Sequence, residues 1–326
     1  MKIYFHIGYP KAGSSMLQKY FFNNHPEINY LGSIPNENTG IVTEKPAGSH
    51  YENYPELKLF IDHLVSDAFQ IENPINHIWK KLASKTLENE NVSVFSSEFV
   101  TSTFFCFPDI EEKINRIHSL GFNGVIIVIR NQVKLIKSQY REHPFDPANL
   151  IHGKPIGIDE WVKKSNTLQY SYLESLKYDR TIDLCNRLFG EENVIVLTFK
   201  DITKPSIQGI SSITEPLELD KEKSFELLNN APIENRGVSS HYNLIRNLKK
   251  KIFGEFPISN YLPDPVVDLS KKVLKKGKKA EYILNDETVS FLNDYFHDSN
   301  KQLEKLVDID LQMLNYPPHF REKTSN

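Results

Sequence analysis

"FHIGYPKAGSSMLQKYF", residues 5–21, has the outline of a phosphate-binding loop but places its lysine differently. The common nucleotide-binding loop reads G-x-x-x-x-G-K-[ST], so that the lysine after the second glycine reaches the β- and γ-phosphates. Here Gly8 and Gly13 keep that spacing, but Ser14 follows the second glycine and Lys11 lies inside the loop. A lysine in this position approaches an anion from the side, which suits a ligand with one 5′-phosphate followed by a transferable group.

The flanking residues place this loop between a strand and a helix. Residues 2–7, KIYFHI, form a short run of β-branched and aromatic residues, which is typical of a buried strand. From Ser14 to about Asn24, apolar residues repeat at helical spacing. The unpaired backbone amides and the positive dipole end at the start of such a helix bind anions. The alternative is that the Gly13–Ser14 turn only caps a helix, with Lys11 in solvent.

The same pattern of strand followed by helix recurs along the chain. Three short runs are almost entirely apolar: VSVF (92–95), GVIIVI (124–129) and NVIVLTF (193–199). Runs that are apolar on both faces indicate parallel strands covered on both sides. Helical patterns lie between them, and they include residues 110–120, 132–142 and 181–189. We predict an α/β protein, similar to the three-layer P-loop nucleotide-binding folds, with a central parallel sheet flanked by helices.

The remaining segments indicate one domain. Residues 33–54 are rich in Gly, Pro, Asn and Ser, which predicts a long surface loop. Helical spacing follows at 57–65 and again at 75–82. From about residue 237 the chain is mainly helical and more basic, and it ends in a polar tail after Pro317 and Pro318. Because we find no convincing linker, we predict a single domain over residues 1–326 with a mainly helical C-terminal part at 237–326.

Composition argues against several classes of protein. A net charge of −3 and a pI of about 6.4 give no global basic field for non-specific nucleic-acid binding. Cys106 and Cys185 lie far apart and lack a C-x-x-C pattern, which argues against a zinc site or a disulfide framework. No run approaches the roughly 18 apolar residues of a membrane span, and no signal-peptide core precedes the glycine loop. We therefore expect a cytoplasmic protein with no transmembrane segment and no nucleic-acid partner.

A second candidate element is IVIRNQVKLIKSQYREH, residues 127–143. Arg130 lies just past an apolar strand, and Ser138 lies in the helix that follows. Ligands of open α/β sheets bind beyond the carboxyl ends of the strands. A guanidinium binds a phosphate through two parallel hydrogen bonds, and a serine hydroxyl can add another. Alone, an arginine at a strand end is equally well a surface or salt-bridge residue.

Together the two elements resemble the sulfotransferases that use 3′-phosphoadenosine-5′-phosphosulfate (PAPS) as the sulfuryl donor. YPKAGSS (9–15) resembles the 5′-phosphosulfate loop of that family, whose pattern is P-K-x-G-[ST]-[ST]. RNQVKLIKSQY (130–140) is similar to the family's 3′-phosphate motif, an R-N-P sequence followed by a serine in the next helix. The resemblance implies that PAPS and its product PAP bind here. It also accounts for the displaced lysine, which suits a phosphosulfate better than a triphosphate.

The resemblance assigns the donor contacts residue by residue. The phosphosulfate would be bound by the loop residues Lys11, Ala12, Gly13, Ser14 and Ser15. Arg130 and Ser138 would hold the 3′-phosphate and so distinguish PAPS from ordinary adenine nucleotides. In the family a late Arg/Gly loop often closes over the 3′-phosphate, and Arg236 in APIENRGVSSH (231–241) is loosely similar to it. The alternative for Arg236 is an ordinary loop at the entry of a helix.

Two positions depart from the family pattern. Gln132 stands where the family commonly has proline, which reduces the rigidity of the turn but removes no phosphate donor. Met16 stands where an aromatic residue is frequent, so the loop is not a standard copy of the cytosolic type.

A third element, VSVFSSEFVTSTFF (92–105), supplies a candidate base. Glu98 follows a strand end, and a carboxylate within hydrogen-bond reach is sufficient to take the proton of an attacking hydroxyl. The glycan-modifying members of the family resemble this arrangement, with a glutamate after the second core strand, whereas others use histidine. We predict Glu98 and Lys11 as the catalytic residues, with His143 as the reserve base. Glu98 is alternatively a helix-cap or salt-bridge carboxylate.

The function hypothesis is sulfuryl transfer from PAPS to a hydroxyl of an acceptor, with a carbohydrate or glycoconjugate favoured by the Glu98 analogy and no metal required. A P-loop small-molecule kinase is the first alternative, although it requires a lysine directly after Gly13. A non-catalytic nucleotide-binding protein is the second. The lysine clusters at 249–251 and 271–279 could contact a polyanionic acceptor or an anionic membrane surface, but solvated helix faces more commonly account for such runs.

Overall fold

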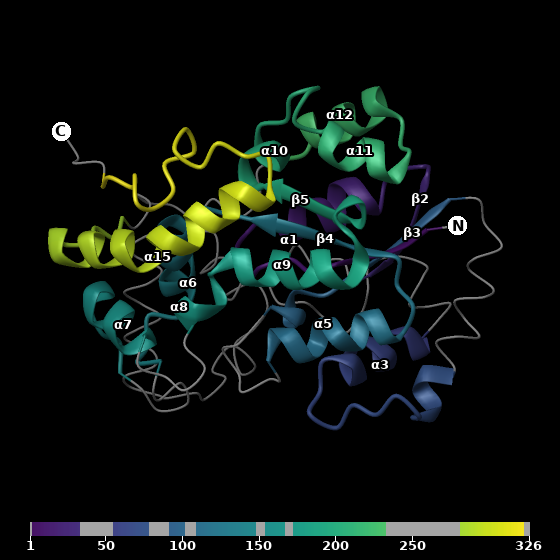
Figure 1. The fold of residues 1–326 in the computed structure, drawn as a ribbon, viewed down its shortest axis with the longest axis horizontal. Coiled ribbons are helices and arrows are strands. Elements are labelled where there is room, and N and C mark those ends of the chain that lie inside the picture. Colours follow the sequence, from purple (N-terminus) through teal and green to yellow (C-terminus); the bar gives the residue numbers. More distant parts are fainter. Residues whose placement is uncertain are drawn as a thin grey trace, which may run out of the picture.

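A computed structural model describes residues 2–32, 55–77, 91–101, 109–147, 154–166, 172–232 and 281–322. Five strands form one sheet in the order β2-β3-β1-β4-β5, and every neighbouring pair is parallel (Figure 1). The strands are β1 (Ile3–His6), β2 (Ile28–Gly32), β3 (Val92–Ser96), β4 (Gly124–Ile129) and β5 (Val194–Thr198). The α/β prediction with a central parallel sheet is therefore confirmed.

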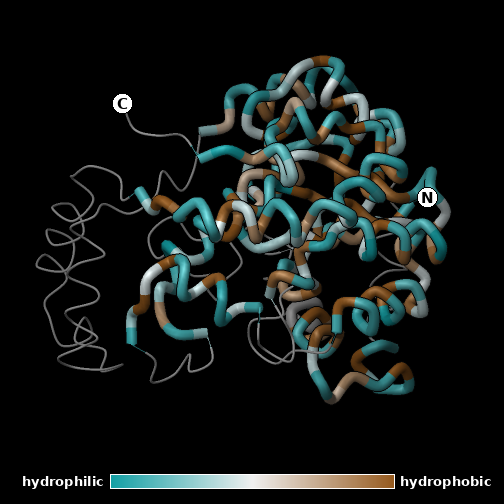
Figure 2. The backbone as a smooth tube through the Cα atoms, turned by 60° about the vertical axis from the view of Figure 1, so that its left-hand side comes forward, coloured by the Kyte–Doolittle hydropathy of each residue, from teal (hydrophilic) through white to brown (hydrophobic). Residues whose placement is uncertain are grey.

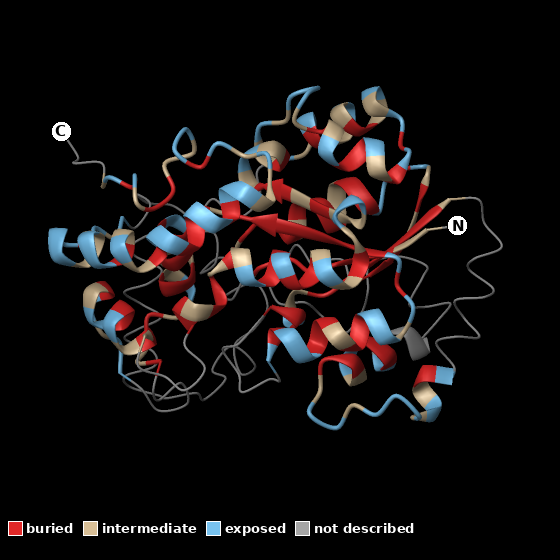
Figure 3. Ribbon diagram, in the orientation of Figure 1, coloured by how far each residue is buried: buried red, intermediate tan, exposed pale blue. Residues whose placement is uncertain are grey.

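Helices surround this sheet and bury it. The described helical segments are α1 (Ser14–Met16), η1 (Leu17–Phe22), α3 (Pro55–Leu64), η2 (Glu98–Val100), α5 (Ile110–Ser119), α6 (Gln132–Glu142), α7 (Ile158–Ser165), α8 (Tyr172–Ser175), α9 (Tyr178–Phe189), η3 (Glu191–Asn193), α10 (Phe199–Thr203), α11 (Ser211–Leu217), α12 (Lys221–Asn229) and α15 (Asp286–Leu306). Helix α9 packs against β4 and β5, while α5 and α15 pack against α9. All six residues of β4 are buried, as expected for a strand covered on both faces (Figure 3).

The apolar runs of the sequence form the centre of this arrangement. Phe5 of β1 pairs in register with Phe95 of β3 and Val125 of β4, and these side chains are fully buried. Figure 2 shows the hydrophobic stretches gathered in the interior, while the outer helices alternate hydrophobic and hydrophilic residues along their length. Side-chain caps fix several helix starts: the Asn131 side chain accepts a hydrogen bond from the Lys134 amide at the start of α6.

The sheet order places the ends of β1 and β4 at a switch in chain direction. After β1 the chain continues to β2 on one side of the sheet, and after β4 it continues to β5 on the other side. Crevices that bind ligands in open α/β sheets form at such points, beyond the carboxyl ends of the strands. The loop after β1 and Arg130 after β4 both lie there.

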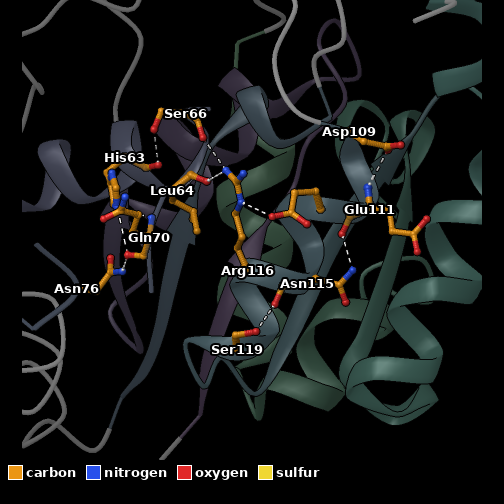
Figure 4. A network of polar contacts seen from close by, with 11 residues as sticks. His63, Leu64, Ser66, Gln70, Asn76, Asp109, Glu111, Asn115, Arg116 and Ser119 are labelled. Atoms are coloured by element: carbon orange, nitrogen blue, oxygen red, sulfur yellow. Dashed lines mark hydrogen bonds and ion pairs between the residues drawn. The ribbon is translucent and has the colours of Figure 1, made fainter. Parts of the chain in front are cut away.

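Arg116 connects helix α5 to the C-terminal end of α3 through hydrogen bonds (Figure 4). Its Nη1 donates to the carbonyl oxygens of Leu64 at 2.8 Å and Ser66 at 2.7 Å, and its Nε contacts Glu112 at 3.1 Å. The guanidinium also lies over the Phe69 ring, 4.7 Å from its centroid. A buried cation is thereby satisfied by carbonyl oxygens at the end of a helix.

The structure differs from the sequence predictions in three places. Residues 28–32 form the edge strand β2, which the sequence reading did not identify. The helix after the loop widens from Leu17 to Phe22 into a π-helix. Residues after Pro317 are not a simple polar tail, because Phe320 is buried and Lys137 contacts Glu322 at 2.5 Å.

Several predicted features are outside the described residues. They are the surface loop 33–54, most of the helix at 75–82, Cys106, Arg236 and the two lysine clusters. Within the described ranges, no helix combines the length and apolar composition that crossing a bilayer requires.

Candidate functional site

The loop after β1 has a backbone that exposes amide groups at the start of a helix. Lys11 and Gly13 both have positive φ, 69° and 103° respectively. The Ala12 amide donates to the Tyr9 carbonyl at 2.9 Å, which closes a tight turn. The Met16 amide donates to the Gly13 carbonyl at 3.0 Å and begins the helical hydrogen-bond pattern, so the Ser14 and Ser15 amides precede that pattern. This geometry suits an anion.

Ser14 and Gly8 pack closely beneath the loop. A Cβ atom on Gly8 would lie 2.0 Å from Ser14 Oγ, so no larger residue fits there without displacing the serine. Ser14 is 1% exposed, and its hydroxyl lies beside the Glu98 carboxyl. Ala12, by contrast, is fully buried, and its side chain belongs to the core.

Lys11 projects from the loop to the far end of α6. Its ammonium forms an ion pair with the carboxylate of Glu142, the last residue of that helix. The two side chains remain 29% and 42% exposed, so the pair lies at the surface of the site. The loop lysine thus contacts an acidic residue that the sequence analysis did not single out. One signal was available: Glu142 lies four residues after Ser138, which is one turn further along the same helix face.

Glu98 lies two residues beyond the end of β3, in the short helix η2. Three contacts hold this turn: the Ser97 hydroxyl caps it, Thr101 Oγ1 donates to the Gly8 carbonyl at 3.0 Å, and Lys113 Nζ donates to the Phe99 carbonyl at 2.8 Å. The Thr101 contact joins the turn directly to the first residue of the phosphate-loop pattern. Glu98 is consequently fixed beside that loop.

The electrostatics of Glu98 reflect this position. Burial raises the pKa of its carboxyl above the ordinary value, and the nearby negative charge of Glu142 raises it further. The positive charge of Lys11 and the Ser14 hydroxyl act in the opposite direction on the same pKa. Glu98, Lys11 and Ser14 are thereby brought into one cluster. A carboxyl whose pKa moves toward neutrality is better matched to general-base chemistry near pH 7.

Arg130 is the second anchor of the site. Its Nη1 donates to the Lys11 carbonyl oxygen at 2.6 Å, and its guanidinium lies over the Phe199 ring, 4.3 Å from the centroid. Tyr178 donates from its hydroxyl to the Arg130 carbonyl at 2.7 Å. Burial, with the charge of Arg141 as a further cause, lowers the pKa of Arg130. Its Nε is buried and has no hydrogen-bond partner in the described ranges.

The remaining predicted residues are placed less directly. Ser138 is partly buried on α6, three residues from Arg141 and on the same helix face. Ser15 is partly buried at the start of α1. His143 Nε2 lies 3.9 Å from Glu142 Oε2, so the reserve base neighbours Glu142.

Gln132, which stands where the resembled family commonly has proline, has a structural role that the sequence did not reveal. Its side chain is fully buried, and its Nε2 donates to Asn300 Oδ1 of α15 at 2.6 Å. Asn300 Nδ2 in turn donates to the Pro317 carbonyl at 2.6 Å. The preceding residue, Asn131, also donates to the Asn315 carbonyl. The turn beside Arg130 is therefore braced by the C-terminal segment.

Comparisons with known proteins support the fold of this site. Neither the protein-family models nor the curated proteins include a match to the sequence. Among solved structures, the chain is similar to a sulfotransferase from Alicyclobacillus acidocaldarius, with 14% identity, a TM-score of 0.50, and coverage of 97% of this chain and 99% of that one. A sulfotransferase domain from the Synechococcus PCC 7002 olefin synthase shows 12% identity and a TM-score of 0.43, covering 95% of each chain. The similarity to the Alicyclobacillus structure shows that the chain has a sulfotransferase-like α/β fold.

Proposed function

We propose that this protein transfers a sulfuryl group from PAPS to a hydroxyl group of an acceptor, with a carbohydrate or glycoconjugate as the acceptor class. The observation that carries the proposal is the hydrogen bond from Arg130 Nη1 to the Lys11 carbonyl. It joins the loop after β1 to the residue after β4 at the switch point of the sheet. One bound nucleotide can then contact an anion site at each end.

The loop end fits a 5′-phosphosulfate. The Ser14 and Ser15 amides precede the helical hydrogen bonds, and the buried Ser14 hydroxyl lies at the same turn. Gly8 leaves no room for a side chain between the strand and that hydroxyl. In this assignment Gly13, Ser14 and Ser15 bind the phosphosulfate through their amides, and Ala12 holds the turn in the core. Lys11 neutralises the charge that develops next to the 5′-phosphate.

The Arg130 end fits the 3′-phosphate. A buried guanidinium with an unused Nε provides directed donors, and its position over Phe199 fixes its plane. Ser138 on the facing helix would add a hydroxyl donor. We further propose that Arg236, which lies outside the described residues, closes over the same phosphate. These contacts would distinguish PAPS and PAP from nucleotides without a 3′-phosphate.

Glu98 would act as the general base. The donor supplies an activated sulfuryl group, and the chain's part is to align an acceptor hydroxyl and remove its proton. The raised pKa of Glu98 makes its carboxylate a stronger base than an exposed glutamate. Its turn is held by the contacts of Thr101 and Lys113. The acceptor class rests on the resemblance of Glu98 to the base of the glycan-modifying sulfotransferases.

Calorimetric titration with PAP, AMP and ATP tests the nucleotide assignment. Charge-assisted hydrogen bonds to a phosphate contribute about 1.5–3 kcal/mol, so PAP should bind about 10- to 100-fold more tightly than AMP. Stronger binding of ATP than of PAP in the presence of Mg²⁺ would contradict the proposal and favour a kinase.

A matched pair of variants tests the role of Glu98. Glu98→Gln should abolish transfer from PAPS to a panel of carbohydrate acceptors while PAP binding is retained, because it removes the proton acceptor and keeps the side-chain shape. Glu304→Gln, on the exposed surface of α15, serves as the control and should change neither quantity. Full transfer activity in Glu98→Gln would exclude Glu98 as the base.

A further inference from the structure

Glu142 contacts the Lys11 loop but has no part in the proposed function. This residue ends α6, and its carboxylate forms an ion pair with the ammonium of Lys11. Lys11 is the side chain that the proposed function assigns to the donor's phosphosulfate. In this structure the ammonium of Lys11 is therefore already paired with a carboxylate of the protein.

Two carboxylates flank this single lysine. The charge of Glu142 raises the pKa of Glu98, and the charge of Lys11 lowers it, so all three groups interact. His143 Nε2 lies 3.9 Å from the same Glu142 oxygen. A site with two carboxylates around one ammonium opposes the binding of a highly charged anion unless one carboxylate withdraws. Glu98 is fixed through the η2 turn, whereas Glu142 is at a helix end with its side chain 42% exposed.

We propose that Glu142 is an internal competitor for Lys11, holding the ammonium until an anionic nucleotide displaces the carboxylate. The inference rests on the proposed function, because it takes the Lys11 loop as the nucleotide phosphate site. Displacement requires the Glu142 side chain, which is 42% exposed, to turn away from Lys11.

The competition has a consequence for selectivity. A ligand that binds only after the ion pair opens has its affinity reduced by the fraction of molecules in which the pair is open. Weakly held anions that contact the loop alone gain too little to open it. A nucleotide that also contacts Arg130 has additional binding energy available. Glu142 thereby makes occupation of the Lys11 loop depend on contacts at the other end of the site.

A double-mutant cycle with PAP as the titrant tests this proposal by calorimetry. Partly exposed ion pairs contribute roughly 0.2–1 kcal/mol, so Glu142→Gln should tighten PAP binding by about 1.4- to fivefold. In a Lys11→Met background the same Glu142→Gln change should have less than half of that effect on the binding free energy, because no ammonium remains to be released.

The cycle separates competition from simple repulsion. If Glu142→Gln tightens PAP binding by at least half as much in the Lys11→Met background, Glu142 acts only as a repelling charge and the proposal is wrong. If Glu142→Gln leaves PAP affinity unchanged in the wild-type background, the proposal is also wrong. A wild-type protein that does not prefer PAP over AMP would instead contradict the proposed function, so the two failures are distinguishable.

A control variant addresses non-specific effects of charge removal. Glu160→Gln removes an exposed carboxylate on α7 that pairs with Lys164 at 3.3 Å, and it changes the net charge by the same amount. It should leave PAP affinity unchanged. Equal tightening in Glu160→Gln and Glu142→Gln would show that net charge alone is responsible and would overturn the proposal.

Discussion

The two ends of the candidate site meet at one hydrogen bond, from Arg130 to the Lys11 carbonyl, yet they are built differently. The loop end is shaped by its own backbone, through the positive φ of Lys11 and Gly13 and a turn that spans four residues. The Arg130 end is held by the C-terminal segment: Gln132 contacts Asn300, 168 positions away, and Asn131 contacts Asn315, 184 positions away. One end of the candidate site is thus encoded locally, and the other depends on tertiary packing.

This difference separates two kinds of vulnerability. A locally shaped loop fails when its own residues are changed, because its backbone conformation admits few side chains. A site braced over a long distance fails when either brace is changed, even far from the ligand. The two ends should therefore respond differently to substitutions.

The largest effect is expected for Gly13→Ala at the loop end. Gly13 has φ 103°, and an added Cβ would lie 2.5 Å from Ile202 Cδ1. Left-handed backbone and overpacking together should lower the free energy of unfolding by about 2–5 kcal/mol. PAP affinity should fall as well, because the amides that follow Gly13 would move. Urea unfolding and calorimetry measure the two quantities.

Gly121→Ala is the matched control for this prediction. Gly121 also has positive φ, 86°, but an added Cβ there meets no atom within 4 Å. The loss should be only about 1–2 kcal/mol from backbone strain, with PAP affinity unchanged. If both variants lose the same stability and neither loses PAP affinity, the loop is not the tightly constrained element described here.

A smaller effect is expected for Gln132→Pro at the braced end. Proline is well suited to the first position of a helix, where Gln132 lies, so the backbone of α6 should tolerate it. The change removes the hydrogen bond to Asn300 and leaves a buried amide oxygen without that donor, which costs about 1–3 kcal/mol of unfolding free energy. Urea unfolding measures the loss.

Gln132→Ala serves as the comparison for the proline variant. It removes the same side-chain contact without changing backbone rigidity, so the two variants should lose similar stability. If both variants are as stable as the wild type, the contact between Gln132 and Asn300 contributes nothing to stability, and the contrast between the two ends is weakened.

The sequence predicted the parts of the fold that are encoded by continuous apolar runs. All four predicted strands are found within one residue of their expected limits, and β4 matches its range at both ends. The edge strand β2 was missed because INYLG mixes polar and apolar residues and ends in glycine, and its strand character comes from pairing with β3. The C-terminal residues were interpreted as a polar tail because one buried Phe320 among polar neighbours gives no periodic signal.

The candidate site divides in the same way. The spacing of Gly8, Lys11 and Gly13 can be recognised in the sequence because these residues lie close together in the chain. The pairing of Lys11 with Glu142 and the hydrogen bonds of Gln132 could not be predicted, because each depends on how distant elements pack. A single sequence contains both partners of such contacts but does not show which residues are neighbours. The roles of the predicted donor and base residues remain proposals.

The smallest effect concerns Lys113, which supports the Glu98 turn from an intermediate distance of 14 positions. Burial, with the charge of Arg116 as a second cause, lowers the pKa of Lys113 to about 8. Between that value and the unfolded value near 10.5, the unfolded chain binds more protons than the folded one, so this lysine's contribution to stability rises with pH.

The unfolding free energy of the wild type minus that of Lys113→Met should increase by about 1 kcal/mol from pH 7 to pH 9. Urea unfolding at both pH values measures it, and Lys301→Met, on the exposed surface of α15, should show no such increase. A difference that stays constant or falls with pH would show that Lys113 is not buried as a cation, and the Phe99 carbonyl would then need another donor to hold the Glu98 turn.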